Sequence, residues 1–362
     1  MTPLQPSLGM VLKTSKGVHQ SCLYGYRFSL RKQSIIKRFA DCTPVHFITH
    51  VKHLPAESLL MLWGSHPVPS GVPKGVQIIR IEDGFLRSVG LGADLVQPLS
   101  LVADRNGIYY DATCLSDLER LLQHTEFSIE LIERASQLRC KIIEHRLTKY
   151  SVGSGNWHRS SSLVPKGCRV LLVAGQVETD ASIRYGASGI RTNIGLLKAV
   201  RQANPDAYIL YKPHPDVVAG LRSVGQGENQ AEHWCNEVLP DVSMGELLTE
   251  VDEVHVMTSL TGFEALLRGK PVICYGQPFY SGWGLTKDII PFSRRTRPLS
   301  LDMLVAGSLI LYPMYLSKST GKVTSPECAL DDLLAWRDKN QDHLSTSRKI
   351  ARVVIKRFFS LP

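Results

Sequence analysis

Strand and helix patterns alternate between residues 167 and 290, and this alternation limits the folds open to the chain more than any other feature. Short apolar runs predict strands at 168–176, 207–215, 253–259 and 271–277. Between them, apolar residues at three- and four-residue spacing predict helices at 190–203, 244–251 and 260–269. We therefore expect a Rossmann-like domain with a parallel, doubly wound sheet and right-handed crossovers.

A stretch rich in Ser and Gly at 150–167 separates this region from the preceding part of the chain, and we interpret it as a domain boundary. Upstream, the segment 116–149 has helical periodicity, with Ser116 and Glu119 in the order of a capping box. The pattern allows either one helix or two helices with a break near Thr125. Three earlier apolar runs predict strands at 58–64, 76–84 and 99–111. We therefore expect a second α/β domain in this half.

The sequence after residue 295 predicts two helices, at 298–316 and 326–340. The chain thus divides into an N-terminal domain, a C-terminal domain, helices that pack back on the body, and a basic tail, at 1–160, 161–295, 296–344 and 345–362. The eight cysteines are scattered without a CxxC pair or a His/Cys cluster. We expect buried thiols rather than disulfides or zinc ligands.

The formal net charge of +9 suits an acidic partner, such as a nucleotide, an anionic sugar, a nucleic acid or a lipid surface. Part of this charge lies in the tail, 345–362, where apolar residues at helical spacing are surrounded by Lys and Arg. The pattern predicts either a basic amphipathic helix for an anionic membrane or a final helix packed on the body. We find no signal peptide or long apolar segment and expect a cytoplasmic protein.

Two carboxylates, Glu82 and Asp83, end the apolar run at 76–84 and precede Gly84. The carboxyl ends of strands in a parallel sheet face the ligand crevice, so the pair is a candidate for substrate contact. A polar turn, in which Asp83 caps the next segment and Gly84 takes a positive φ, explains the same residues. The motif alone leaves both interpretations open.

Polar groups also follow the expected strands of the 167–290 region. GQVETDAS, after the first strand, contains Asp180, which suits either chemistry or a helix cap. KPHPD, after the second strand, holds Lys212 and His214 beside stiff prolines, an arrangement that suits a phosphate. TSLTGFE, after the third, places Ser259 at a helix N-terminus, which favours an anion, and Glu264 one turn later.

A Ser N-cap explains Ser259 by itself, but it does not explain why Lys212, His214 and Glu264 occur at the same sheet edge. Together these loops predict a nucleotide-phosphate site. The sequence has no GxGxxG fingerprint and no GxxxxGK[ST] motif, which argues against dinucleotide-binding and P-loop NTPase functions. It also has no acidic DxD stretch, so we expect the phosphate to be neutralised by protein groups rather than by a metal.

These motifs, in order, resemble those of the capsule polysaccharide β-Kdo transferase family of the KpsC type. The likeness covers about residues 60–316 and rests on RIEDGFLRSVGLGADLVQPLSLVADRNGIYYD, GQVETDASI, YKPHPDV and MTSLTGFEALLRGKPVICYGQPFYSGWGLT. Such proteins usually carry two transferase modules in tandem. GQVETDAS resembles the second, C-terminal-type module, and the chain has the length of one module.

The resemblance implies two Rossmann-like domains facing a cleft, the GT-B type of glycosyltransferase fold. It implies a retaining transfer of Kdo from CMP-β-Kdo to a Kdo-terminated glycolipid or glycan through a β-(2→7) linkage, in the biosynthesis of the capsular polysaccharide linker. The N-terminal domain is then the acceptor side and the C-terminal domain binds the CMP-sugar. The basic tail would hold the enzyme at the inner face of the cytoplasmic membrane.

The resemblance also implies roles for individual residues, without a metal or other cofactor. The expected CMP-binding residues are Gln176, Lys212, His214, Pro215, Thr258, Ser259, Gly262 and Glu264. Retention by two inversions needs a carboxylate nucleophile, for which Asp180 is the candidate, while Glu82 or Asp83 would deprotonate the acceptor hydroxyl. Arg87 and Arg184 suit the sugar or acceptor carboxylates, although a surface or interdomain ion pair explains each equally well.

Three alternatives remain open at this point. The same motifs also suit transfer of another CMP-sugar, such as a sialic acid. The second alternative is a non-catalytic nucleotide-binding module. We do not expect the protein to bind nucleic acid, because basic residues do not alternate with aromatic ones in the sequence. The third concerns Tyr280 and Trp283, which suit either core packing or a wall of the cleft.

Overall fold

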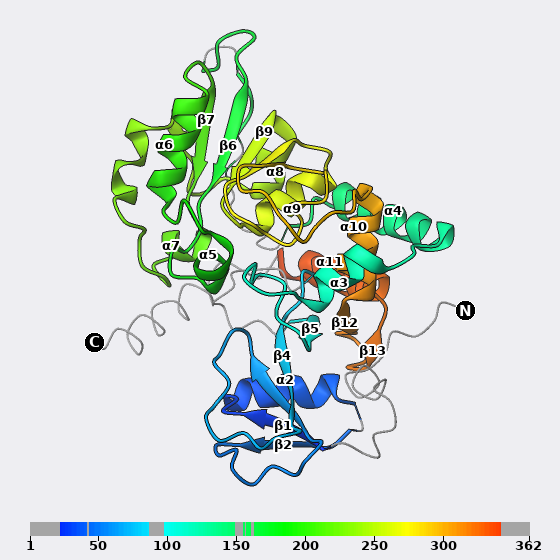
Figure 1. Cartoon of the computed structure of the whole chain (residues 1–362). Coiled ribbons are helices and arrows are strands. Elements are labelled where there is room, and N and C mark those ends of the chain that lie inside the picture. The colour runs from blue at the N-terminus through cyan, green and yellow to red at the C-terminus, as the bar shows by residue number, and fades with distance from the viewer. Residues whose placement is uncertain are drawn as a thin grey trace.

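The computed structural model describes residues 22–41, 43–86, 98–148, 155, 157–160 and 163–341. It contains two sheets with helices around them, one formed mainly by the N-terminal half and the other by the C-terminal half (Figure 1). The predicted α/β class is therefore confirmed. Arg87 and the basic tail lie outside the described residues.

The first sheet has the strand order β13-β12-β5-β4-β3-β1-β2. Its strands are β1 (Leu23–Tyr26), β2 (Val45–Ile48), β3 (Leu59–Trp63), β4 (Gln77–Asp83), β5 (Ser100–Asp104), β12 (Pro313–Leu316) and β13 (Val323–Thr324). β1 to β4 pair in parallel, whereas β5, β12 and β13 add antiparallel strands beyond β4. The predicted parallel environment of β4 thus holds on its β3 side only.

The helix predicted over 298–316 is wrong in its last part. A short helix α10 (Leu301–Val305) and a π-helical turn η2 (Ala306–Leu311) precede β12. Pro313 lacks a backbone N–H and cannot continue a helix, and it pairs instead with Val102 of β5. Met314 and Leu316 are buried in the core of the first sheet, together with helix α2 (Leu30–Phe39).

The second sheet is parallel throughout, with the strand order β11-β10-β9-β6-β7-β8. Its strands are β6 (Val170–Ala174), β7 (Tyr208–Lys212), β8 (Glu237–Val238), β9 (Glu253–Val256), β10 (Val272–Cys274) and β11 (Lys287–Asp288). Its helices are α5 (Ala181–Gly186), α6 (Asn193–Ala203), α7 (Pro215–Val218), η1 (Glu228–His233), α8 (Met244–Glu250) and α9 (Leu260–Leu267). This confirms the predicted doubly wound sheet, whose topological switch lies between β6 and β9.

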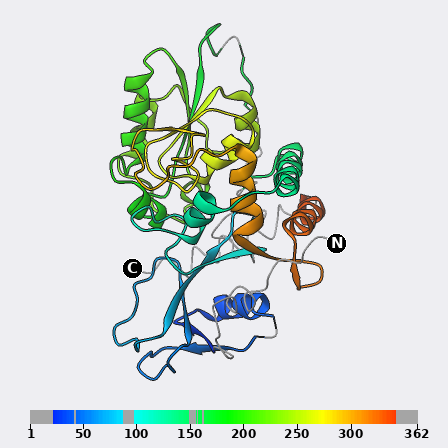
Figure 2. The same cartoon turned by 45° about the vertical axis from the view of Figure 1, so that its right-hand side comes forward.

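The segment 116–148 contains two helices separated at Thr125, so the second of the two predicted alternatives is correct. They are α3 (Asp117–His124) and α4 (Ile129–Glu144). Helix α11 (Pro326–Gln341) and α10 lie beside α4 (Figure 2), and the ion pairs Arg134–Glu327 and Arg139–Asp302 join them at 2.7 and 2.8 Å. The C-terminal segment is thus attached to α4 as well as to the first sheet.

The cysteine prediction is only partly right. Cys235 and Cys274 are buried, but Cys22, Cys140 and Cys328 are exposed, and the described cysteines form no disulfide. Within the described ranges, we find no helix with the length and apolar character that a membrane crossing requires.

Candidate active site

A cavity of about 430 Å³ lies where the carboxyl ends of the strands of both sheets meet. The first sheet contributes the ends of β3 and β4 and the loop after β5. The second sheet contributes the loops after β6, β7 and β9, on both sides of its topological switch. Ten of the predicted site residues line it: Glu82, Asp83, Gln176, Asp180, Lys212, His214, Pro215, Thr258, Ser259 and Glu264.

Asp180 lies at the N-cap of α5, directly after the loop that follows β6. Its backbone is extended, with φ −66° and ψ 149°, but its side chain makes no cap hydrogen bond. Asp180 is one of the residues that line the cavity. The capping interpretation of its side chain is therefore wrong, although the residue occupies the cap position.

Lys212 ends β7 and is 4% exposed. Its Nζ donates to the carbonyl oxygens of Leu239 at 3.4 Å and Pro240 at 3.2 Å. Burial lowers the pKa of Lys212 to about 8, and the nearby Asp241 opposes this shift. The cavity thus contains a buried ammonium group that loses its proton in a mildly alkaline range.

His214 is the N-cap of α7, and Pro215 occupies the first helical turn. The ring Nδ1 of His214 accepts a hydrogen bond from the backbone N–H of Asp216 at 3.2 Å. Because Nδ1 is an acceptor, the neutral imidazole carries its proton on Nε2. The sequence Lys-Pro-His-Pro thereby fixes both the orientation and the tautomer of a hydrogen-bond donor at the cavity.

The N-terminus of α9 forms another wall of the cavity. Ser259 is its N-cap and accepts a hydrogen bond from the Thr261 backbone N–H at 3.2 Å, so the capping interpretation of Ser259 is correct. Thr261 and Glu264 also line the cavity, and both are buried. A helix N-terminus at a cavity wall attracts an anion through its partial positive charge.

Gln176 connects the loop after β6 to the loop after β9. Its side-chain amide donates to Thr258 Oγ1 at 3.1 Å and accepts from the Thr258 backbone N–H at 2.9 Å. The buried Asn193 in turn exchanges two hydrogen bonds with the Gln176 backbone, each at 2.9 Å. Gln176 therefore holds Thr258 in place at the cavity wall.

Glu82 and Asp83 face this wall from the end of β4. Glu82 Oε1 accepts from the Asp83 backbone N–H at 3.0 Å, and its Oε2 accepts from the Tyr110 hydroxyl at 3.4 Å. Burial and the charge of Glu82 raise the pKa of Tyr110 well above its usual range, so Tyr110 stays a donor. Both residues line the cavity, and Gly84 does not have the positive φ that the polar-turn interpretation requires.

Two predicted residues lie elsewhere. Gly262 is not among the lining residues; a Cβ there would lie 2.3 Å from the Tyr280 hydroxyl, which packs beneath the first turn of α9. Tyr280 and Trp283 are fully buried, which confirms the core-packing interpretation of both. Arg184 is exposed outside the lining, with its guanidinium 5.3 Å from the centre of the Tyr185 ring.

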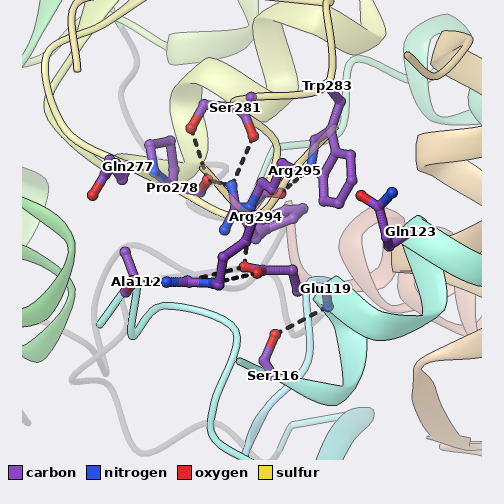
Figure 3. A network of polar contacts seen from close by, with 12 residues as sticks. Ala112, Ser116, Glu119, Gln123, Gln277, Pro278, Ser281, Trp283, Arg294 and Arg295 are labelled. Atoms are coloured by element: carbon purple, nitrogen blue, oxygen red, sulfur yellow. Dashed lines mark hydrogen bonds and ion pairs between the residues drawn. The ribbon is translucent and has the colours of Figure 1, made fainter. Parts of the chain in front are cut away.

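An ion-pair network around the buried Glu119 joins α3 to the segment that contains Arg294 and Arg295 (Figure 3). Ser116 caps α3 by accepting from the Glu119 backbone N–H at 3.0 Å, but the Glu119 carboxylate pairs with Arg294 at 2.7 Å and Arg295 at 3.1 Å. Arg295 also donates to the carbonyl oxygen of Pro278, at 2.6 Å. Burial lowers the pKa of Arg295 to about 10, although Glu119 opposes the shift.

Several residues that line the cavity are not among the site residues predicted from the sequence. They are mostly aromatic or lie in irregular loops: Trp63, Phe85, Tyr109, Tyr110, Ser182, Arg222 and Phe279. The aromatic residues of YYD and QPFY were visible as clusters, but their positions depend on packing between distant segments. No group of three or more His, Cys, Asp or Glu side chains in the described part of the chain is arranged to hold a metal ion.

Comparison with known proteins identifies the family of the chain. Residues 70–321 match the family described as capsule polysaccharide biosynthesis protein. The capsule polysaccharide modification protein LipA of Neisseria meningitidis serogroup A / serotype 4A is 43% identical over 328 residues, which are 88% of this chain and 46% of LipA. The lipopolysaccharide-processing protein LpsZ of Rhizobium meliloti is 42% identical over 280 residues, covering 75% of this chain and 63% of LpsZ. The chain thus spans about half the length of LipA.

Two solved structures of Thermosulfurimonas dismutans KpsC are similar along most of the chain. The β-Kdo 2,7 transferase has a TM-score of 0.73 and 40% identity, covering 88% of this chain and 100% of that one. The β-Kdo 2,4 transferase has a TM-score of 0.73 and 30% identity, covering 88% and 99%. The chain belongs to the family of capsule polysaccharide biosynthesis proteins that includes the KpsC β-Kdo transferases.

Proposed function

We propose that this protein is a retaining β-Kdo transferase of the GT-B type, which moves Kdo from CMP-β-Kdo to a Kdo-terminated glycolipid or glycan in capsular polysaccharide biosynthesis. One observation carries the proposal. Asp180 and the phosphate-binding elements of one sheet line the same cavity as Glu82 and Asp83 of the other sheet. A nucleophile and a base on opposite walls suit a double displacement on one sugar carbon.

In this proposal the C-terminal half binds the donor. The N-terminus of α9 at Ser259 and the Nε2–H of His214 attract the phosphate, and the Lys212 ammonium adds positive charge beneath them. Glu264, one turn into α9, accepts from the ribose hydroxyls. Gln176 acts by positioning Thr258.

The first chemical step is the transfer of Kdo to Asp180. A carboxylate oxygen of Asp180 attacks the anomeric carbon while the bond from this carbon to the phosphate oxygen breaks, and the electron pair leaves with CMP. Groups that stabilise the phosphate charge, Ser259 and His214, lower the barrier to this departure. The configuration at the anomeric carbon is inverted once.

The second step transfers Kdo to the acceptor. The acceptor hydroxyl attacks the same carbon, the bond to Asp180 breaks, and the hydroxyl proton passes to Glu82 or Asp83. A second inversion restores the β configuration. The free Asp180 carboxylate is regenerated, so no group of the protein is consumed.

The linkage is proposed to be β-(2→7). The higher identity to the 2,7 transferase than to the 2,4 transferase supports this assignment, as does the likeness of GQVETDAS to the second type of module. We further propose that the basic tail, which lies outside the described residues, binds the inner face of the cytoplasmic membrane, where a lipid-linked acceptor would be found.

The test is incubation with CMP-Kdo, generated in situ, and a synthetic acceptor that ends in Kdo. We expect the acceptor to gain the mass of one Kdo residue and NMR to show a β linkage from its 7-hydroxyl. Asp180→Asn should lower kcat by at least a thousandfold while CMP affinity, measured by calorimetry, stays within twofold of the wild type.

Two further variants identify the base in the same assay. Glu82→Gln and Asp83→Asn differ by one residue on the same strand, and we expect only one of them to lower transfer by about a hundredfold or more. Lys198→Gln, an exposed change outside the cavity lining, is the control. An active Asp180→Asn enzyme, or a product of α configuration, would exclude the proposed double displacement.

A further inference from the structure

Arg222 has an unusual position in the cavity wall. It lies in the loop between α7 and η1, in a stretch where the sequence shows no regular pattern, and it is exposed. It is the one arginine among the described lining residues. Its guanidinium forms no hydrogen bond or ion pair with any residue that the structure describes, whereas the ammonium of Lys212 donates to two backbone carbonyls.

The loop that carries Arg222 is attached to α7 by its backbone. The backbone N–H groups of Leu221 and Arg222 both donate to the carbonyl oxygen of Asp216, at 2.8 and 3.1 Å. These bonds fix the direction in which the chain leaves the helix, next to the residues that hold His214. Arg222 is therefore held close to the elements proposed to bind the donor.

Two glutamates hold the other end of this loop. Glu178 Oε2 accepts from the Gln226 backbone N–H at 2.9 Å, and Glu228 Oε2 accepts from the Gly225 backbone N–H at 2.7 Å. The Gly225 backbone lies close to the Glu178 carboxylate, since a Cβ on Gly225 would be only 2.5 Å from Glu178 Oε1. Glu178 belongs to the GQVETDAS motif, so this motif connects the Asp180 region to the Arg222 loop.

Acidic side chains outnumber basic ones in the cavity lining, so an anionic ligand needs a cationic partner there. Five carboxylate residues line it: Glu82, Asp83, Asp180, Asp216 and Glu264. The proposed donor carries two negative groups, the phosphate and the carboxylate of the sugar. An acidic ligand in an acidic cavity requires cationic partners, and a guanidinium matches the paired oxygens of either group.

We propose that Arg222 binds an anionic group of the CMP-sugar, either the sugar carboxylate or the phosphate, and that Glu178 positions the Arg222 loop. This inference rests on the proposed function and adds a binding residue to it. In the carboxylate case Arg222 has the role that the sequence suggested for Arg87 and Arg184.

The test measures binding rather than turnover. CMP and CMP-Kdo each compete with a fluorescent cytidine nucleotide, on Asp180→Asn, which cannot form the covalent adduct, and on the double variant Asp180→Asn/Arg222→Gln. Loss of a charge-assisted bidentate contact should weaken binding by on the order of tenfold to a hundredfold. If Arg222 binds the carboxylate, only CMP-Kdo is weakened; if it binds the phosphate, CMP and CMP-Kdo are weakened equally.

The control is Arg120→Gln, which removes an exposed arginine of α3 outside the cavity lining and should leave both affinities unchanged. Affinities of both ligands that are the same for Asp180→Asn and for Asp180→Asn/Arg222→Gln would overturn the inference. Failure of the proposed function looks different, since the wild type would then bind CMP-Kdo without forming product. A wild type that binds neither ligand would overturn both.

The role of Glu178 is tested by a double-mutant cycle. Glu178 accepts from the backbone N–H groups of Gln226, at 2.9 Å, and Asn193, at 2.7 Å. Glu178→Gln replaces one of these two acceptor oxygens, and it should weaken the same ligand as Arg222→Gln, by a smaller factor. In the Arg222→Gln background the Glu178 change should have little further effect, because a positioning residue acts only through the group that it positions. Equal effects in both backgrounds would show that Glu178 does not act through Arg222.

Discussion

Asp180 and Ser259 occupy equivalent positions in their helices, yet their side chains make different contacts. Both are N-caps with extended backbones, but only Ser259 accepts a cap hydrogen bond. Residue type predicts capping for both. The sequence therefore does not show that Asp180, unlike Ser259, leaves the cap position unused and lines the cavity without a cap hydrogen bond.

The candidate site was predictable where it depends on strand ends. Lys212, His214 and Thr258 follow strands with clear patterns, so their common edge could be inferred before their contacts were known. Arg222 and Tyr109 lie in irregular loops, whose course depends on hydrogen bonds such as those of Glu178. The periodicity of the sequence carries no information on such loops.

The buried amine of Lys212 predicts how CMP binding depends on pH. Because its pKa is lowered to about 8, the free enzyme loses this charge above pH 8, and CMP affinity measured by calorimetry should fall by about tenfold between pH 7 and pH 9.5. The unfolded chain binds this proton up to about pH 10.4, so the fold gains stability from Lys212 as pH rises from about 8 to 10.4. If CMP binding is lost in this pH range, deprotonation of Lys212 has not caused it by destabilising the fold.

Lys212→Met is the matched variant, since it keeps the length of the buried chain. It should bind CMP more weakly at pH 7 and lose most of the change above pH 8. A wild-type affinity that stays constant up to pH 9.5 would show that the Lys212 charge does not act on the nucleotide.

At the scale of elements, four strands of the second sheet followed from local pattern, whereas the two-residue β8 and the end of the first sheet did not. Each of β6, β7, β9 and β10 is a buried apolar run next to a helix, so its identity is encoded locally. β12 is a four-residue run whose partner, β5, lies about two hundred residues earlier in the chain. Such short apolar runs are ambiguous between strand and helix until the partner is known.

The contact of Glu119 with two arginines predicts a large effect on stability. Glu119 is 3% exposed, and removing its charge takes away the carboxylate that is paired with the buried guanidinium of Arg295. Glu119→Gln should lower the free energy of unfolding in urea by about 3–5 kcal/mol. The capping interpretation alone predicts a far smaller effect, because the cap bond is donated by the Glu119 backbone.

Glu133→Gln is the matched control, since Glu133 is exposed on α4 and its loss should change stability by no more than about 0.5 kcal/mol. If Glu119→Gln unfolds at the same urea concentration as the wild type, the ion-pair network of Figure 3 does not stabilise the fold.

At the scale of the whole molecule, the cavity depends on segments from both halves of the chain. The C-terminal segment leaves the second sheet, lies along α4 and returns to the first sheet as β12 (Figure 2). It therefore connects the walls that carry Glu82 and Asp180. This return was only partly foreseen, because the sequence predicted helices that pack back and not an added strand.

The basic tail leads to a prediction about the whole protein. Deleting residues 345–362 should release it from liposomes that contain anionic lipid, because several Lys and Arg charges near the surface are lost. Transfer to a soluble acceptor should remain within twofold of the wild type. Neutral liposomes are the control, and undiminished binding of the shortened protein to anionic liposomes would contradict a membrane role for the tail.

The most direct measurement is intact-protein mass spectrometry after incubation with CMP-Kdo in the absence of acceptor, followed by peptide mapping. We expect a protein heavier by one Kdo residue, with the added mass on the peptide that contains Asp180, and we expect addition of the acceptor to remove it. An unmodified protein, or an adduct on another carboxylate such as Glu82, in a preparation that transfers Kdo would contradict the proposed role of Asp180.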